Sequence, residues 1–213
     1  MSETSRPIGC VIMASGLARR FGSNKLLADF GGRPLLCRAL DATDTPQLAC
    51  RIVVTRSAEV ETLCQTLGVA CLRHALPGRN DTVRLGLEAL LTLQPGLAGC
   101  IFLPGDQPLL RRETVEALVC AFVADTRTQK ETERAIFRLA FQAENDPEPL
   151  VGSPVLFGCG YFSALRTLSE GKGGSVLLRR YPERVCNVFT ADRAELLDAD
   201  TPEALRELKQ FLI

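Results

Sequence analysis

The sequence has no tryptophan, a single histidine, and no apolar run near the ~18 residues that a membrane-spanning helix needs. Lys and Arg together number 25, as do Asp and Glu, so the chain lacks the positive excess typical of proteins that bind nucleic acid. The polar N-terminal residues show no signal-peptide pattern. We therefore expect a cytoplasmic protein that binds neither membranes nor nucleic acid.

Zinc, redox and common hydrolase motifs are missing as well. The nine cysteines include no C-x-x-C pair, and we expect most of them to be small apolar core residues in a reducing compartment. Neither G-x-S-x-G nor H-E-x-x-H occurs. The one histidine, His74, follows an apolar stretch and is interpreted as structural.

What the chain does contain is an alternation of short apolar runs with longer helical patterns. Apolar residues recur three or four apart in helices that begin at Pro34, span 81–93 and 112–124, and run from Pro202 onward. The alternation predicts an α/β fold whose mainly parallel sheet is covered by helices on both faces. The predicted strands are 8–13, 51–55, 69–72, 100–103, 135–141 and 184–189.

No linker or repeat divides the sequence, so we expect one domain over residues 1–213. Two polar stretches, 124–134 and 143–149, are interpreted as loops within it. Ligands of mainly parallel sheets bind at the carboxyl ends of the strands, so residues that follow the predicted strands are the first candidates for a site.

The first predicted strand runs into a glycine-bounded loop from Gly16 to Lys25, which also carries Arg19 and Arg20. Glycine lets the backbone approach an anion, and cations balance the charge of phosphate. The spacing G-x5-G-x2-K matches neither the P-loop nor the dinucleotide-binding motif. The loop therefore indicates a phosphate site, with an ordinary basic turn as the alternative.

Carboxylates follow at two later points. Asp106 comes after a predicted strand and a glycine, where one carboxylate could hold Mg²⁺ bound to a triphosphate; a turn or helix-capping role is the alternative. Asp198 precedes Thr201 and Pro202, which form a typical helix start. Asp198 is not needed for that cap and could reach a metal. A further stretch, 78–86, is interpreted either as a simple helix entry or as a contact to a nucleotide base.

Together these segments resemble the motifs of the molybdenum-cofactor nucleotidyltransferases, most closely the CTP:molybdopterin cytidylyltransferases. The family's L-A-A-G-x-S-x-R-M-G-x-x-K corresponds to Met13–Lys25, and its G-x-x-x-S-[LV]-x-x-G to Gly78–Gly86. Its G-D-[MQ]-P corresponds to Gly105–Pro108, and its D-x-D-T-P to Asp198–Pro202. Guanylyltransferase relatives more often carry N-x-N-T-P at the last position, which favours the cytidylyl branch.

The resemblance implies a three-layer α/β/α Rossmann-like nucleotidyltransferase fold, with a nucleotide-binding part at about 7–110 and an acceptor-binding part at about 111–213. It implies that Arg20, Lys25 and Asp106 are catalytic, and that Asp106 and Asp198 hold Mg²⁺ as the cofactor. The nucleotide-binding residues that it implies are Ala14, Ser15, Gly16, Arg20, Lys25, Gly78, Thr82 and Asp106.

The sequence departs from the family's pattern at three places, two of which weaken the match on the acceptor side. Ser15 replaces the usual alanine or glycine near the base. The family's G-H-P reads Gly152-Ser153-Pro154 here, so a histidine is missing. The family's G-D-x-G-A-R loses its Asp and Arg in residues 171–176.

The expected reaction moves CMP from CTP to the phosphate of a molybdopterin-type cofactor and releases pyrophosphate. A phosphate nucleophile is already ionised, so no side-chain base is required, which suits a chain with one histidine. Alternatives are GTP:molybdopterin guanylyl transfer, transfer to a sugar or alcohol phosphate, and a non-catalytic cofactor chaperone. The expected partners are CTP or another NTP, the molybdopterin-type cofactor, and a molybdenum hydroxylase or its chaperone.

Overall fold

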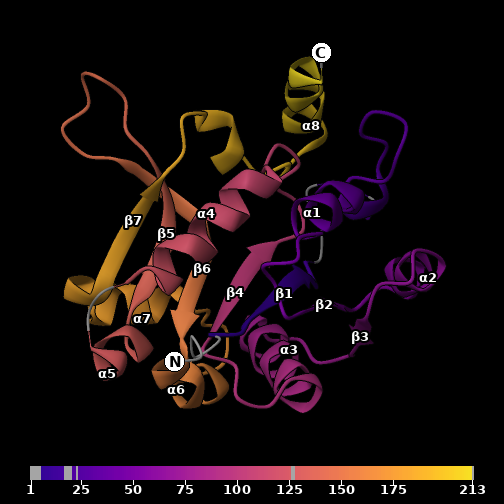
Figure 1. Cartoon of the computed structure of the whole chain (residues 1–213). Coiled ribbons are helices and arrows are strands. Elements are labelled where there is room, and N and C mark those ends of the chain that lie inside the picture. Colours follow the sequence, from indigo (N-terminus) through magenta and orange to yellow (C-terminus); the bar gives the residue numbers. More distant parts are fainter. Residues whose placement is uncertain (1–5, 17–20, 23, 126–127, 213) are drawn as a thin grey trace.

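The structure, a computed structural model, describes residues 6–16, 21–22, 24–125 and 128–212. Within this part of the chain one sheet has the strand order β3-β2-β1-β4-β6-β5-β7 (Figure 1). The strands are β1 Ile8–Ala14, β2 Cys50–Thr55, β3 Cys71–Arg73, β4 Gly99–Pro104, β5 Ile136–Phe141, β6 Leu150–Gly158 and β7 Val185–Phe189. The helices are α1 Leu36–Ala42, α2 Ala58–Thr66, α3 Arg79–Leu93, α4 Arg112–Val123, α5 Gln129–Glu133, α6 Phe162–Arg166, α7 Ser175–Arg180 and α8 Pro202–Leu208.

Helices cover both faces of the sheet, as the sequence predicts. Residues of the central strands alternate between two buried clusters: Ile12 packs with residues of α1, α4 and α8, and its neighbour Val11 packs with residues of α3, α6 and α7. Figure 1 shows α4 crossing one face of the sheet. Strands β1, β2, β3 and β4 are parallel, and so are β5 and β7, whereas β6 is antiparallel to both of its neighbours. The three-layer α/β/α fold with a mainly parallel sheet is confirmed.

Strand β6 is the element that the sequence pattern fails to predict. Glycine and proline at Gly152 and Pro154 are typical strand breakers, and proline has no N–H for the ladder. The structure tolerates them at an irregularity: Arg138 pairs with Val155, but the next residue, Leu139, pairs with Gly152. Two residues of β6 therefore bulge out of the β5 pairing, and the strand continues on both sides.

Several short helices also differ from the prediction. The stretch 124–134 is not wholly a loop, because α5 forms within it, capped by reciprocal hydrogen bonds between Thr128 and Glu131. Helices α2, α6 and α7 are not predicted, since each is too short to show a helical period; α2 buries only Val60 and Cys64. The stretch 143–149 is a loop, as expected.

The topology brings the carboxyl ends of β1 to β4 to one edge of the sheet. At this edge the N–H of Gly105 donates to the carbonyl of Met13 over 3.0 Å. A Cβ at Gly105 would lie 3.3 Å from that carbonyl oxygen and 3.0 Å from Leu36, so glycine permits the close approach. The residue after it, Asp106, is thereby held beside the loop that follows β1.

The predicted character of the cysteines holds in part: four of the nine free thiols are buried, four are half-buried, and Cys120 is exposed. None of the described helices is both long enough and apolar enough to cross a membrane.

Gly86 of α3 offers a test of the packing between this helix and the sheet. An added Cβ would lie 2.6 Å from Val11 and 3.0 Å from Val54, so Gly86→Ala should lower the free energy of unfolding by about 1–3 kcal/mol through overpacking. Helix propensity alone predicts a gain of ~1 kcal/mol. Urea unfolding measures the sign, and Thr92→Ala, at an exposed position of the same helix, is the control and should not destabilise.

Candidate active site

A cavity of about 700 Å³ lies at the carboxyl ends of the central strands. Seven of the residues predicted from the sequence line it: Ser15, Gly16, Lys25, Gly78, Thr82, Asp106 and Asp198. Ala14 is buried at the end of β1 and does not line the cavity. Arg20 lies outside the described residues.

Lys25 is placed by a short 3₁₀ turn, Lys25–Leu27, whose cap is the Asn24 side chain accepting from the N–H of Leu26. Its Nζ lies 2.5 Å from Oδ2 of Asp106 and 2.9 Å from Oδ1 of Asp200. The residue is only 8% exposed, so an unpaired ammonium here would be costly. Burial by itself lowers the pKa of Lys25, but the hydrogen bonds and charges of the two carboxylates outweigh it and raise that pKa.

The two acidic segments of the cavity are joined through the backbone. The N–H of Ala199, which is fully buried, donates to the carbonyl of Asp106 over 2.9 Å. Thr201 then caps α8 by accepting from the N–H of Ala204, as the sequence predicts for its Thr-Pro pair. Asp106 itself lies in a turn, and α4 begins only at Arg112, so the alternative of a helix cap at Asp106 is wrong.

The cluster holds more negative than positive charge. Asp106, Asp198 and Asp200 gather around one ammonium, that of Lys25, whereas the guanidinium groups of Arg56 and Arg79 line other parts of the cavity wall. Asp198 is exposed by surface area, but its surface faces the cavity. Burial of the carboxyl group, and then the charges of Asp106 and Asp200, raise its pKa to about 6; Lys25 and a hydrogen bond from Gln107 act in the opposite direction.

This donor set fits a magnesium ion. In the described part of the chain, no three acidic, histidine or cysteine side chains are arranged as a complete metal site. Mg²⁺ commonly binds proteins through one or two carboxylates and completes its octahedron with waters and substrate phosphates. Asp106 and Asp198 would supply those carboxylates, and the excess negative charge would favour the cation.

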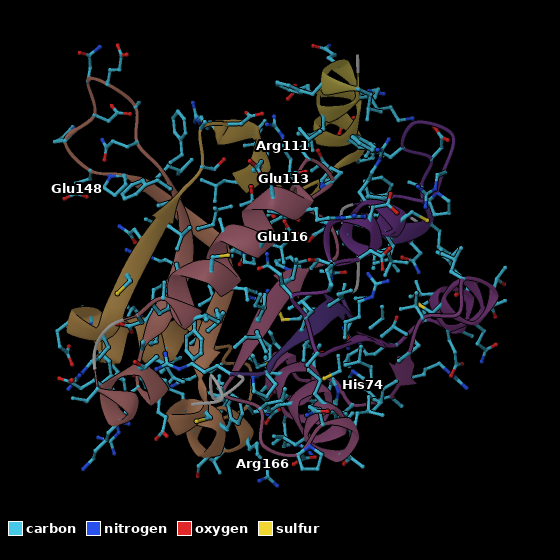
Figure 2. The ribbon with its side chains drawn as sticks, in the orientation of Figure 1. His74, Arg111, Glu113, Glu116, Glu148 and Arg166 are labelled. Carbon is cyan, nitrogen blue, oxygen red and sulfur yellow. The ribbon has the colours of Figure 1, made fainter. Side chains whose placement is uncertain are left out.

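At the β2 side of the cavity, the hydroxyl of Ser15 lies 3.1 Å from the carbonyl of Val54 and 3.0 Å from Nε2 of His74. Figure 2 labels His74 near β3 and α3. Both contacts are hydrogen bonds at once only if Ser15 donates to Val54 and accepts from a protonated Nε2. Burial, and then the charge of Arg56, lower the pKa of His74, which favours the neutral ring. In that arrangement of protons the hydroxyl offers the cavity a lone pair and no proton.

Four polar residues line the cavity that were not predicted as site residues from the sequence: Arg56, Arg79, Ser153 and Asp200. Arg56 donates from Nε to the carbonyl of Ser15 over 2.8 Å and so holds the loop after β1. It directly follows the strand predicted over 51–55, and the carboxyl-end rule could have found it. Asp200 is not among the predicted site residues, because nothing in the sequence shows its pairing with Lys25.

Comparison with known proteins gives a consistent result. Residues 10–185 match the family described as MobA-like NTP transferase domain. The bifunctional protein GlmU of Anaeromyxobacter sp. (strain K) is 35% identical over 130 residues, which are 57% of this chain and 26% of that protein. A probable molybdenum cofactor guanylyltransferase from Pyrococcus horikoshii is 26% identical over 111 residues, 52% of this chain and 54% of that protein. The chain thus spans about a quarter of the length of the GlmU relative.

Solved structures with similar folds cover nearly all of the chain. Rv0371c from Mycobacterium tuberculosis H37Rv has a TM-score of 0.75 at 22% identity, covering 97% of this chain and 99% of that one. A nucleotidyl transferase from Methanothermobacter has a TM-score of 0.73 at 20% identity, covering 98% and 99%. At these identities the likeness shows the fold, which is that of nucleotidyltransferases.

The crowding of carboxylates makes a prediction about Asp198 in the metal-free protein. Its carboxyl group should titrate near pH 6 in ¹³C NMR, and Asp106→Asn should lower this value by removing a repelling charge. Lys25→Gln should raise it further. A pKa that moves in the same direction in both variants would contradict the electrostatic account.

The raised pKa of Asp198 also makes the stability of the folded protein depend on pH. Asp198 binds its proton more tightly in the folded than in the unfolded chain, whose reference value is 3.8. Its contribution to stability is therefore fully present below that pH and is lost as the pH rises through about 6. Asp198→Asn should remove this part of the pH dependence of unfolding.

Proposed function

The chain belongs to the MobA-like NTP transferase domain family, and from this premise we propose that it transfers CMP from CTP to the phosphate of a molybdopterin-type cofactor, releasing pyrophosphate. The observation that carries the proposal is the convergence of Lys25, Asp106 and Asp198 in a cavity large enough for a nucleotide. Such a cluster supplies positive charge for phosphates and carboxylates for a magnesium ion.

The chemistry asks little of the side chains beyond positioning and charge. An attacking phosphate oxygen is already ionised near neutral pH, so no general base is needed, and none of the cavity-lining residues in the described chain is a histidine. Mg²⁺, when bound, would neutralise the nucleotide phosphates and polarise the reacting phosphorus. Lys25 and Arg20 would neutralise the departing pyrophosphate, and Asp106 and Asp198 would hold the metal.

The polarity at Ser15 supports a base that carries an exocyclic amine. The hydroxyl is fixed by Val54 and His74 as an acceptor toward the cavity, so it suits the amine of cytosine and opposes the carbonyl that uracil has at the same place. The D-x-D-T-P sequence at Asp198–Pro202 supports CTP over GTP by resemblance. The guanylyltransferase name of the Pyrococcus relative keeps GTP as the second candidate.

The direct test is release of pyrophosphate by the purified protein with Mg²⁺, each of the four nucleoside triphosphates in turn, and molybdopterin. We expect release that depends on the acceptor and is fastest with CTP. A preference for GTP would replace the cytidylyl assignment with guanylyl transfer. Binding of the cofactor without release from any nucleotide would support a chaperone in place of an enzyme.

Asp106→Asn should lower kcat/KM about a hundredfold, since it removes one electrostatic group from the charged centre, worth ~3 kcal/mol. Steady-state pyrophosphate release measures the effect. Glu148→Gln is the matched control, because Glu148, labelled in Figure 2, lies in the exposed loop between β5 and β6, does not line the cavity, and undergoes the same charge change. Unchanged turnover in Asp106→Asn would remove this carboxylate from the mechanism.

Ser15→Ala should reduce the preference for CTP over UTP about three- to tenfold, the value of one hydrogen bond, and should leave the KM for the acceptor unchanged. Competition between the two nucleotides gives the ratio of their kcat/KM values. Ser163→Ala, at an exposed position of α6, is the control. An unaltered ratio in Ser15→Ala would show that this hydroxyl does not read the base.

A further inference from the structure

A second, smaller cavity of about 280 Å³ adjoins the first. The two share Met13, Arg79 and Ser153 as lining residues, so they meet at the border between β1, α3 and β6. The smaller cavity extends from there along the opposite half of the sheet, between β5, β6 and the segment before α7. A molecule in it can therefore reach into the cavity of the carboxylates.

The walls of the smaller cavity are mainly apolar. Phe102 and Phe157 meet edge to face, with 6.0 Å between their ring centres, and Val83, Val155 and Leu165 lie beside them. Gly174 packs against this wall, since a Cβ there would lie 3.0 Å from the ring of Phe157. Apolar and aromatic walls favour a flat body with few hydroxyl groups.

Two guanidinium groups interrupt this apolar lining. Arg79 and Arg138 both line the cavity, no lining residue in the described chain is acidic, and neither arginine has a carboxylate partner among the described residues. Elsewhere in the structure, arginines such as Arg51 and Arg73 form ion pairs with a neighbouring Asp or Glu, which balances their charge. A cavity with two unbalanced positive charges is suited to an anion.

Arg138 is held in place by the protein and still has donors to offer. Its Nε donates to Oδ1 of Asn187 on the adjacent strand β7 over 2.8 Å, which fixes the plane of the guanidinium. Neither Nη nitrogen has a hydrogen-bond partner in the part of the chain that the structure describes. Burial lowers the pKa of Arg138, as expected for a cation that is partly removed from water without a compensating carboxylate.

The local irregularity of the sheet explains why Arg138 is in this position. The pairing step after Arg138 leaves Ser153 and Pro154 outside the β5 ladder, so Arg138 and Ser153 line the same cavity from neighbouring strands. Ser153 is the position at which the resembling family often has a histidine. The guanidinium of Arg138 supplies a positive donor on the side where that histidine is missing.

We propose that the smaller cavity is the acceptor site, and that Arg138 binds the electronegative edge of a flat heteroaromatic phosphate ester while Arg79 holds its phosphate at the border of the two cavities. This inference rests on the proposed function, because it assumes that the larger cavity takes the nucleotide. It excludes polyol phosphates as good acceptors, since their hydroxyl groups would meet apolar walls without partners.

The test is calorimetric binding of a hydroxymethylpterin phosphate and of erythritol phosphate, each with Mg²⁺ and a CTP analogue that carries a non-cleavable α,β-methylene bridge. We expect the pterin phosphate to bind the wild-type protein more tightly than the polyol phosphate. Arg138→Met should weaken the pterin phosphate about ten- to a hundredfold, the value of hydrogen bonds to a charged group, and Arg138→Lys should give an intermediate loss.

Arg179→Met is the matched control, because Arg179 is exposed on α7 and lines neither cavity. The thermal unfolding temperature and the affinity for the CTP analogue should be unchanged in all variants. If Arg138→Met does not fold, the loss of pterin phosphate affinity is measured in Arg138→Lys instead. Equal affinities of wild type and Arg138→Met, or tighter binding of erythritol phosphate, would overturn the inference.

The design separates this inference from the proposed function. If the protein turns over CTP with molybdopterin and Arg138→Met leaves the KM for molybdopterin unchanged, the inference is overturned and the proposed function stands. Binding of the pterin phosphate that depends on Arg138, in a protein that releases no pyrophosphate, would support the acceptor site and overturn the proposed reaction.

Discussion

The pairing of the Lys25 ammonium with two carboxylates is the interaction on which the site depends. Asp106 and Asp200 come from segments far apart in the sequence, and Lys25 lies within 2.5 and 2.9 Å of their oxygens. Without a cation between them, these groups and Asp198 would repel one another in a partly buried place. The cluster still carries excess negative charge, which is why its geometry suits a metal ion as a further cation.

The fold supplies the positions and the loops supply the chemistry. Parallel strands bring the residues after β1, β2, β3 and β4 to one edge, and the glycine at position 105 lets the end of β4 approach β1 closely. The backbone bond from Ala199 to Asp106 then attaches the segment before α8 to the same place. The hydroxyl of Ser15 and the ring of His74 lie toward β2 and β3, whereas the carboxylates lie toward β4, so the cavity has a side suited to a base and a side suited to a metal ion and phosphates.

The sequence predicts the central sheet and most of this site because both depend on local patterns. Apolar runs mark β1, β2 and β4. Lys25 and Asp106 lie in loops that follow strands, and Asp198 lies before a capped helix. The prediction fails where tertiary contacts override the local signal. Strand β6 contains Gly152 and Pro154 and exists only because β4 and β5 pair with it on either side.

Partners that are distant in the sequence could not be predicted either. The contact of Lys25 with Asp200, the hold of Arg56 on the carbonyl of Ser15, and the hydrogen bond between Ser15 and His74 join segments that no spacing rule relates. His74 was interpreted as structural, and its contact with Ser15 is a structural one. The same contact sets the polarity of a hydroxyl in the cavity, which the sequence does not reveal.

The most direct test of the account is a crystal structure of the protein with Mn²⁺ and the non-cleavable CTP analogue. The account predicts the metal on Asp106 and Asp198, the phosphates beside Lys25, and the cytosine amine facing the hydroxyl of Ser15. A nucleotide bound elsewhere, or a metal held by residues other than these carboxylates, would contradict it.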